Sequence, residues 1–183
     1  MKVKLWVIVF SLILIASVIA AIVSWFTLYS LLSRAIILEK DLSGILAPEF
    51  SLYDLNGNTL KLSDFKGKIV ILDFMATWCG PCRMQIPHLN FVREKYGDSV
   101  ILISISIDPN HDSEGILKEF LNEYPYANWI WARDTANLRG VYGVTAIPTL
   151  VIIDREGYIR FRHVGLTPSS TLIQEIDKIL RGS

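Results

Sequence analysis

The stretch Ala76-Thr77-Trp78-Cys79-Gly80-Pro81-Cys82 holds both cysteines of this 183-residue chain. It directly follows Ile69–Met75, an apolar run of the kind expected for a strand buried on both faces. Two thiols at this spacing, where a strand is followed by a helix, form a dithiol that can close to a disulfide and reopen. The sequence therefore predicts redox chemistry at Cys79 and Cys82.

Zinc or copper binding and a purely structural disulfide are the alternatives for this cysteine pair. The same spacing supplies half of many zinc sites, but a structural zinc normally takes four ligands and no second cysteine pair occurs in the sequence. The histidines His88, His111 and His163 are scattered without metal-ligand spacing. A disulfide that spans two residues closes too short a loop to stabilise a fold much. We expect no metal and no cofactor beyond the redox-active disulfide Cys79–Cys82.

The N-terminal segment is long and apolar enough to span a membrane. No charged residue occurs from Leu5 to Ser33, whereas about 20 apolar residues suffice to cross a bilayer. A cleaved signal peptide has an apolar core of only about 7–15 residues before its cleavage site. Val18-Ile19-Ala20 resembles such a site, but the apolar run continues well beyond it. We expect residues 1–33 to form an uncleaved signal anchor, a single transmembrane helix.

The charges around this segment indicate its orientation. Lys2, Lys4 and the terminal amine favour a cytoplasmic N-terminus, which places the rest of the chain outside the cytoplasm. Arg34 and Lys40 follow the segment and reduce this asymmetry. The expected location is the cell membrane, with a single-pass anchor in contact with lipid and an extracytoplasmic catalytic domain.

The rest of the chain has the length of one compact domain. We divide it into a stalk at residues 34–46 and a domain at residues 47–183, which holds 137 residues. That domain carries 14 Lys plus Arg against 16 Asp plus Glu, a net charge of −2. Since it has no basic run, we expect no nucleic acid among its partners.

Strand-like and helix-like segments alternate along this domain. Ile69–Met75 and Val100–Ile107 are apolar runs typical of buried strands. Leu150–Ile153 and Tyr158–Val164 flank a turn sequence and predict an antiparallel hairpin. The expected helices, from apolar residues at helical spacing, lie at 80–96, 114–124, 135–142 and 169–180. The order of elements predicts an α/β fold with a mixed central sheet flanked by helices.

These motifs resemble the thioredoxin superfamily. Trp78-Cys79-Gly80-Pro81-Cys82 is similar to its redox signature, and Ala146-Ile147-Pro148-Thr149 is similar to its loop with a cis proline. The segments Ala47–Leu52 and Leu62–Lys68 are more specific. They resemble the alkyl hydroperoxide reductase/thiol-specific antioxidant branch and its TlpA-like, membrane-tethered members. The resemblance covers residues 47–180 and implies a thioredoxin-like fold after the transmembrane helix.

The resemblance and the chemistry of thiol–disulfide exchange together assign roles around the dithiol. Exchange needs a thiolate, and the unpaired N–H groups and dipole at a helix N-terminus favour that anion. Cys79 is therefore the expected exposed nucleophile and Cys82 the resolving thiol. Gly80 permits a tight turn, and Pro81 is tolerated in a first helical turn because its missing N–H breaks no bond there.

Three further residues complete the expected surroundings of the dithiol. Trp78 is either a lid that partly shields the disulfide or a core aromatic. Ile147 and Pro148 are expected to bind substrate, because the backbone before a cis proline can pair with an extended segment.

Asp73 is a carboxylate inside an apolar strand, where burial is costly unless the group is partnered or its pKa is raised. It lies where cytosolic thioredoxins carry a buried aspartate, which implies a proton acceptor for Cys82. The alternative is a structural pairing with Lys or Arg. TlpA-like proteins often carry a glutamate three residues after the second cysteine, where this chain has Gln85. We therefore assign the acid–base role to Asp73.

The activity implied by the resemblance is that of a protein-disulfide oxidoreductase. Gly-Pro between the cysteines and Ile147 before the proline are thioredoxin-like and favour reduction, since thioredoxin has a low potential of about −270 mV. The implied substrates are disulfides of extracytoplasmic proteins, such as apocytochrome c during cytochrome c maturation. The implied electron donor is a CcdA- or DsbD-like membrane protein.

Other functions of the same superfamily are the alternatives. A disulfide oxidase or isomerase for secreted proteins would use the same residues in the opposite direction. A peroxidase of the peroxiredoxin type needs Thr-x-x-Cys, whereas Thr77 lies only two residues before Cys79. A copper-delivery module needs Cys-x-x-x-Cys, which the spacing here does not match.

Overall fold

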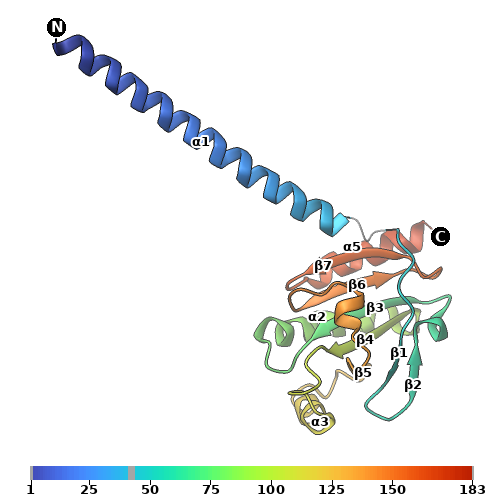
Figure 1. Ribbon diagram of the computed structural model, residues 1–183. Coiled ribbons are helices and arrows are strands. Elements are labelled where there is room, and N and C mark those ends of the chain that lie inside the picture. The colour runs from blue at the N-terminus through green and yellow to red at the C-terminus, as the bar shows by residue number, and fades with distance from the viewer. Residues whose placement is uncertain (1, 41–43, 183) are drawn as a thin grey trace. The chain divides into compact units, whose positions relative to one another are not determined.

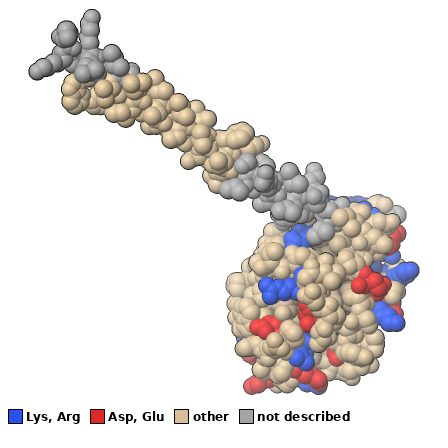
Figure 2. Space-filling view, viewed as in Figure 1, with Lys and Arg blue, Asp and Glu red and all other residues tan. Residues whose placement is uncertain are grey.

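The computed structural model describes residues 2–40 and 44–182. It contains two compact units, an N-terminal helix and an α/β domain (Figure 1). Helix α1 spans Lys2–Lys40, and its stretch Leu12–Tyr29 is long and apolar enough to cross a membrane. On the face that Figure 2 shows, the described part of this helix carries no Lys, Arg, Asp or Glu side chain. The helix therefore fits a single-pass membrane anchor.

The first part of the expected stalk at residues 34–46 is helical, because α1 continues through Lys40. Residues 41–43 of that stalk lie outside the described residues. Gly44 and Ala47 already belong to the domain, since their backbone N–H groups donate to the carbonyl oxygens of Ile159 and Gly157.

The α/β domain is built on a five-stranded mixed sheet with strand order β5-β4-β3-β6-β7 (Figure 1). The central strand β3 (Ile69–Met75) is parallel to β4 (Val100–Ser106), which is parallel to β5 (Ile130–Arg133). On its other side β3 pairs antiparallel with β6 (Thr149–Ile153), which forms a hairpin with β7 (Ile159–Val164). The predicted mixed sheet and hairpin are thus confirmed.

One face of the sheet carries the odd-numbered side chains of β3, which alternate with the even-numbered ones as in any strand. Helices α2 (Gly80–Tyr96) and α5 (Ser169–Arg181) cover this face and share an apolar core with Ile69 and Ile71. Helix α3 (Glu114–Asn122) packs beside the N-terminal part of α2. The short 3-10 helix η2 (Gly97–Ser99) leads from α2 into β4.

The opposite face of the sheet carries the even-numbered side chains of β3. The hairpin of β1 (Ser51–Tyr53) and β2 (Thr59–Lys61) and the following 3-10 helix η1 (Leu62–Phe65) contribute to the core on this face. Helix α4 (Leu138–Val141) contributes to the same core. The sheet is therefore covered on both sides, as predicted.

Helix α4 is shorter than the predicted helix at 135–142. The carboxylate of Asp134 accepts hydrogen bonds from the N–H groups of Leu138, at 2.6 Å, and Arg139, at 2.7 Å. The helix begins only at Leu138 because this carboxylate satisfies the first N–H groups of the helix.

Candidate active site

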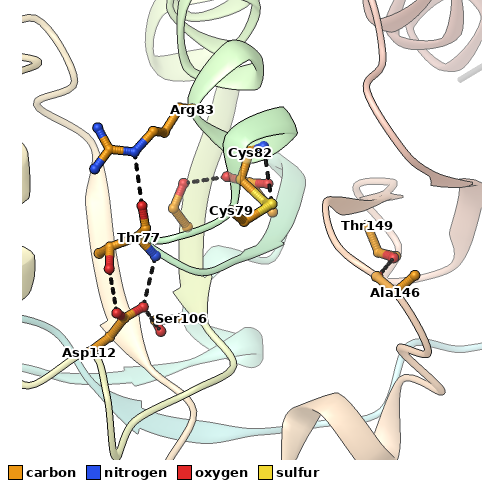
Figure 3. Close-up of a disulfide and its surroundings, with 10 residues drawn as sticks. Thr77, Cys79, Cys82, Arg83, Ser106, Asp112, Ala146 and Thr149 are labelled. Atoms are coloured by element: carbon orange, nitrogen blue, oxygen red, sulfur yellow. Dashed lines mark hydrogen bonds between the residues drawn. A yellow bond between two sulfur atoms is a disulfide. The ribbon is translucent and has the colours of Figure 1, made fainter.

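The two cysteines lie at the junction of β3 and α2 and form a disulfide (Figure 3). Cys79 immediately precedes α2, and its Sγ accepts a hydrogen bond from the N–H of Cys82 at 3.2 Å. Gly80 and Pro81 form the start of the helix, as the sequence predicts. After reduction, the same N–H group and the helix dipole favour a thiolate at Cys79.

The expectation that Cys79 is exposed is wrong for the disulfide state. Cys79 retains 5% of its possible exposure and Cys82 retains 1%. The disulfide packs in an apolar cluster that includes Met75, Ile86 and Phe120. This packing covers both sulfur atoms, although Cys79 remains the more accessible of the two.

Trp78 is 57% exposed, which excludes the alternative of a core aromatic. Its indole N–H donates to Asp108 Oδ2 at 3.1 Å.

A cavity of about 380 Å³ lies beside Trp78, with walls formed by Trp78, Ile107, Asp108, Arg139, Thr145, Ala146 and Ile147. The loop expected to contain a cis proline has a cis peptide bond between Ile147 and Pro148. Since Ile147 also packs against the apolar cluster of the disulfide, the cavity adjoins the redox centre.

Asp73 is buried in β3 on the face covered by α2, between Ile71 and Met75 along the strand. Its Oδ2 accepts a hydrogen bond from Ser104 Oγ at 2.8 Å, and its Oδ1 is buried without a hydrogen-bond partner. Burial raises the pKa of Asp73 to about 7, against the lowering effect of the Ser104 hydrogen bond. Among the described residues no Lys or Arg forms an ion pair with it. This carboxyl group can therefore take up a proton near neutral pH.

Gln85 is fully buried in α2 and has a structural contact for each polar atom of its side chain. Its Nε2 donates to the carbonyl of Thr167 at 2.8 Å, and its Oε1 accepts from the N–H of Thr167 at 2.7 Å. The amide thus ties α2 to the segment that precedes α5. This pairing agrees with leaving Gln85 out of the acid–base chemistry.

Sequence analysis missed one buried carboxylate near the disulfide, that of Asp112 (Figure 3). Both its oxygens accept hydrogen bonds, from the backbone and hydroxyl of Thr77 and from the side chains of Ser106 and His111. Burial acts to raise the pKa of Asp112, but the hydrogen bonds from Ser106, Thr77 and His111 outweigh it and hold the pKa below its usual value. The sequence around Asp112 gave no signal, because Thr77 lies 35 residues away along the chain.

The family of the chain follows from comparison with known proteins. The model of the AhpC/TSA family matches residues 44–162, which include the disulfide and the cis proline. The chain belongs to the AhpC/TSA family. The resemblance to the alkyl hydroperoxide reductase/thiol-specific antioxidant branch is therefore confirmed.

Named relatives and a solved structure are similar to most of this chain. Thioredoxin-like protein YneN of Bacillus subtilis is 34% identical over 131 residues, which are 72% of this chain and 76% of the relative. Thiol-disulfide oxidoreductase ResA of Bacillus anthracis is 33% identical over 141 residues, covering 77% and 80% of the two chains. The crystal structure of the exposed lipoprotein thioredoxin Etrx1 of Streptococcus pneumoniae is 30% identical with a TM-score of 0.63, covering 72% of this chain and 99% of that one.

These comparisons confirm the thioredoxin-like fold and the protein-disulfide oxidoreductase activity expected from the sequence. Cys79 and Cys82, the two cysteines of the chain, form a disulfide at the start of α2 in this fold. Within residues 2–40 and 44–182, no three His, Cys, Asp or Glu side chains gather as potential metal ligands.

Proposed function

We propose that this protein is a membrane-anchored thiol–disulfide oxidoreductase that reduces disulfides of extracytoplasmic proteins through Cys79 and Cys82. The observation that carries the proposal is the disulfide at the N-terminus of α2, which adjoins the cavity walled by Trp78 and Ile147. The apolar helix α1 supports the anchor. The relative described as an exposed lipoprotein thioredoxin supports a location at the cell surface.

In the proposed reaction the reduced protein donates two electrons to a client disulfide. The thiolate of Cys79 attacks one client sulfur, which forms a mixed disulfide and releases the other client sulfur as a thiolate. Asp73 accepts the proton of Cys82, and the Cys82 thiolate attacks Cys79 Sγ. That attack releases the second client sulfur and closes the Cys79–Cys82 disulfide, so the client is reduced and the protein is oxidised.

Asp73 is suited to this proton transfer by its environment. Its pKa of about 7 lets it hold or release a proton close to the working pH, which is the property of an efficient general base. It shares the α2-covered face of β3 with Met75, whose side chain packs in the same cluster as Cys82. Its unpartnered Oδ1 is the atom free to accept the proton.

The cavity beside Trp78 provides the proposed binding surface for the client. Trp78, Asp108 and the loop with Ile147 all contribute to its lining. An extended client segment seated there can pair with the backbone of Ile147, next to Pro148, while its disulfide faces Cys79. Secreted proteins, including apocytochrome c, are the proposed clients, and a CcdA- or DsbD-like membrane protein is the proposed source of electrons.

The proposed topology predicts that alkaline phosphatase fused after Ser183 is active, because this reporter needs the oxidising extracytoplasmic space to form its disulfides. The same fusion without residues 2–33 serves as the control and is expected to be inactive. Cell fractionation should recover the fusion with full-length chain in the membrane. Activity only from a cytoplasmic reporter, or a soluble mature protein that starts near Ala21, would show that the topology is wrong.

A further inference from the structure

The short segment from Thr77 to Cys79, which carries the proposed nucleophile, is held by a buried carboxylate on the loop after β4. Asp112 Oδ2 accepts from the backbone N–H of Thr77 at 2.9 Å, and Asp112 Oδ1 accepts from Thr77 Oγ1 at 2.5 Å (Figure 3). Asp112 is itself fully buried. Two hydrogen bonds to one residue restrain both the position and the rotation of that residue.

Further hydrogen bonds hold Asp112 and Thr77 themselves in place. Ser106 Oγ donates a hydrogen bond to Asp112 Oδ2 at 2.5 Å. The other carboxylate oxygen, Asp112 Oδ1, lies 2.9 Å from His111 Nδ1. The carbonyl of Thr77 accepts from Arg83 Nε at 2.9 Å, as Figure 3 shows on the opposite side of Thr77 from Asp112. Every polar group of Thr77 is therefore engaged, and two of its three bonds go to Asp112.

We propose that Asp112 is a positioning residue, which fixes Thr77 so that Cys79 Sγ stays directed at the N–H of Cys82 at the start of α2. This inference rests on the proposed role of Cys79 as the nucleophile. Cys79 follows Thr77 by two residues, and Cys82 N–H donates to its sulfur at 3.2 Å. Loss of the Asp112 anchor frees the segment, which weakens this hydrogen bond and raises the pKa of the Cys79 thiol in the reduced protein.

The chemistry of the contacts distinguishes two substitutions at this position. In D112A the backbone N–H of Thr77 loses its buried acceptor. In D112N the amide oxygen can accept from the N–H of Thr77 and from Ser106 Oγ, while the amide nitrogen donates to Thr77 Oγ1 and His111 Nδ1. Hydroxyl groups rotate and a neutral imidazole nitrogen can accept, so the amide preserves the anchor without the charge.

Asp154 offers a matched control for a general loss of stability. It directly follows the last residue of β6, whereas Pro148 precedes the first residue of that strand. This carboxylate is also buried, and it accepts from the N–H groups of Glu156, at 3.0 Å, and Tyr158, at 2.8 Å. It also accepts from Arg160 Nε at 2.5 Å. D154A therefore deletes a comparable hydrogen-bonded carboxylate, but one that does not contact the active-site segment.

The test is the rate of iodoacetamide alkylation of Cys79 as a function of pH, in the reduced full-length protein in detergent micelles. We expect the inflection of the D112A profile to move to higher pH, with alkylation at pH 7 slower by up to about tenfold for each unit by which the pKa of the Cys79 thiol rises. D112N should stay within about twofold of the parent rate. D154A should keep the parent profile even where its melting temperature falls.

Three results would overturn the proposal: an unchanged profile in D112A, an equal shift in D154A, or a rate in D112N as low as that of D112A. Should D112A not fold, T77V replaces it, because valine keeps the backbone bond and the size of threonine but removes the hydroxyl donor. We then expect alkylation about threefold slower, and a parent-like rate would overturn the proposal. In the parent protein, alkylation of Cys79 no faster than that of Cys82 would instead contradict the nucleophile assignment itself.

Discussion

Cys79→Ser is expected to abolish reduction of insulin disulfides, whereas Cys82→Ser is expected to accumulate mixed disulfides with the substrate. A serine hydroxyl cannot attack a disulfide, so the first variant cannot begin the exchange. The second variant retains the nucleophile at the start of α2 but lacks the thiol that resolves the intermediate. Insulin turbidity and non-reducing electrophoresis of the full-length protein measure the two effects.

The parent protein and the Cys79→Ser/Cys82→Ser double variant are the controls for these measurements. The double variant should neither reduce insulin nor trap it, which separates covalent capture from simple adsorption to the micelle. Activity that survives in Cys79→Ser, or trapping that is stronger in Cys79→Ser than in Cys82→Ser, would show that the roles of the two thiols are reversed.

Asp73→Asn is expected to slow the release of the mixed disulfide by about a hundredfold near neutral pH, the low end of the range for a positioned general base. The amide has nearly the same size as the carboxylate but cannot accept the proton of Cys82. In the parent, the release rate should fall as the pH decreases below about 7, where Asp73 becomes protonated. This inflection should be absent from the variant. Stopped-flow release of a labelled peptide measures it.

The stability of the same variant gives an independent check on the burial of Asp73. Since the folded-state pKa of Asp73 is raised to about 7 from 3.8, its ionisation costs stability progressively as the pH rises from about 4 to about 7. Asp73→Asn removes this cost. The free energy of unfolding of the variant should therefore increase relative to the parent across that interval and stay constant above it, as measured by urea titration.

Gln85→Ala is the control for Asp73→Asn. Gln85 is buried like Asp73, but it lies on α2, the helix that begins at the disulfide. The substitution leaves the N–H and carbonyl of Thr167 without their buried partners, so we expect a loss of about 1–3 kcal/mol in stability. The exchange rate should change little. If Asp73→Asn exchanges as fast as the parent while Gln85→Ala does not, the acid–base role is assigned to the wrong residue.

The parts of the fold and site that are encoded locally could be predicted from the sequence. The continuous apolar run of β3 and the Cys-Gly-Pro-Cys stretch that opens α2 place the dithiol, and a single carboxylate among apolar residues marks Asp73. These features can be recognised without knowing any distant residue, because a buried strand, the start of a helix and a buried charge are each visible in a short stretch of sequence.

The features that the sequence did not reveal depend on contacts between distant segments. The anchor of Thr77 by Asp112 joins the start of α2 to the loop after β4, and no local pattern couples those positions. The low exposure of Cys79 results from packing against side chains of α2 and α3, including Ile86 and Phe120. The cavity beside Trp78 likewise takes its walls from four separate parts of the chain.

The reduction potential of the Cys79–Cys82 pair tests the central claim, a reductant of protein disulfides, most directly. The full-length protein in detergent is equilibrated with redox buffers of known potential, and its thiols are trapped and counted. With Gly80-Pro81 between the cysteines and Asp73 behind them, we predict a value nearer the roughly −270 mV of thioredoxin than the roughly −120 mV of a strong oxidant. A potential above about −180 mV, the range of disulfide isomerases and oxidases, would contradict a reducing role.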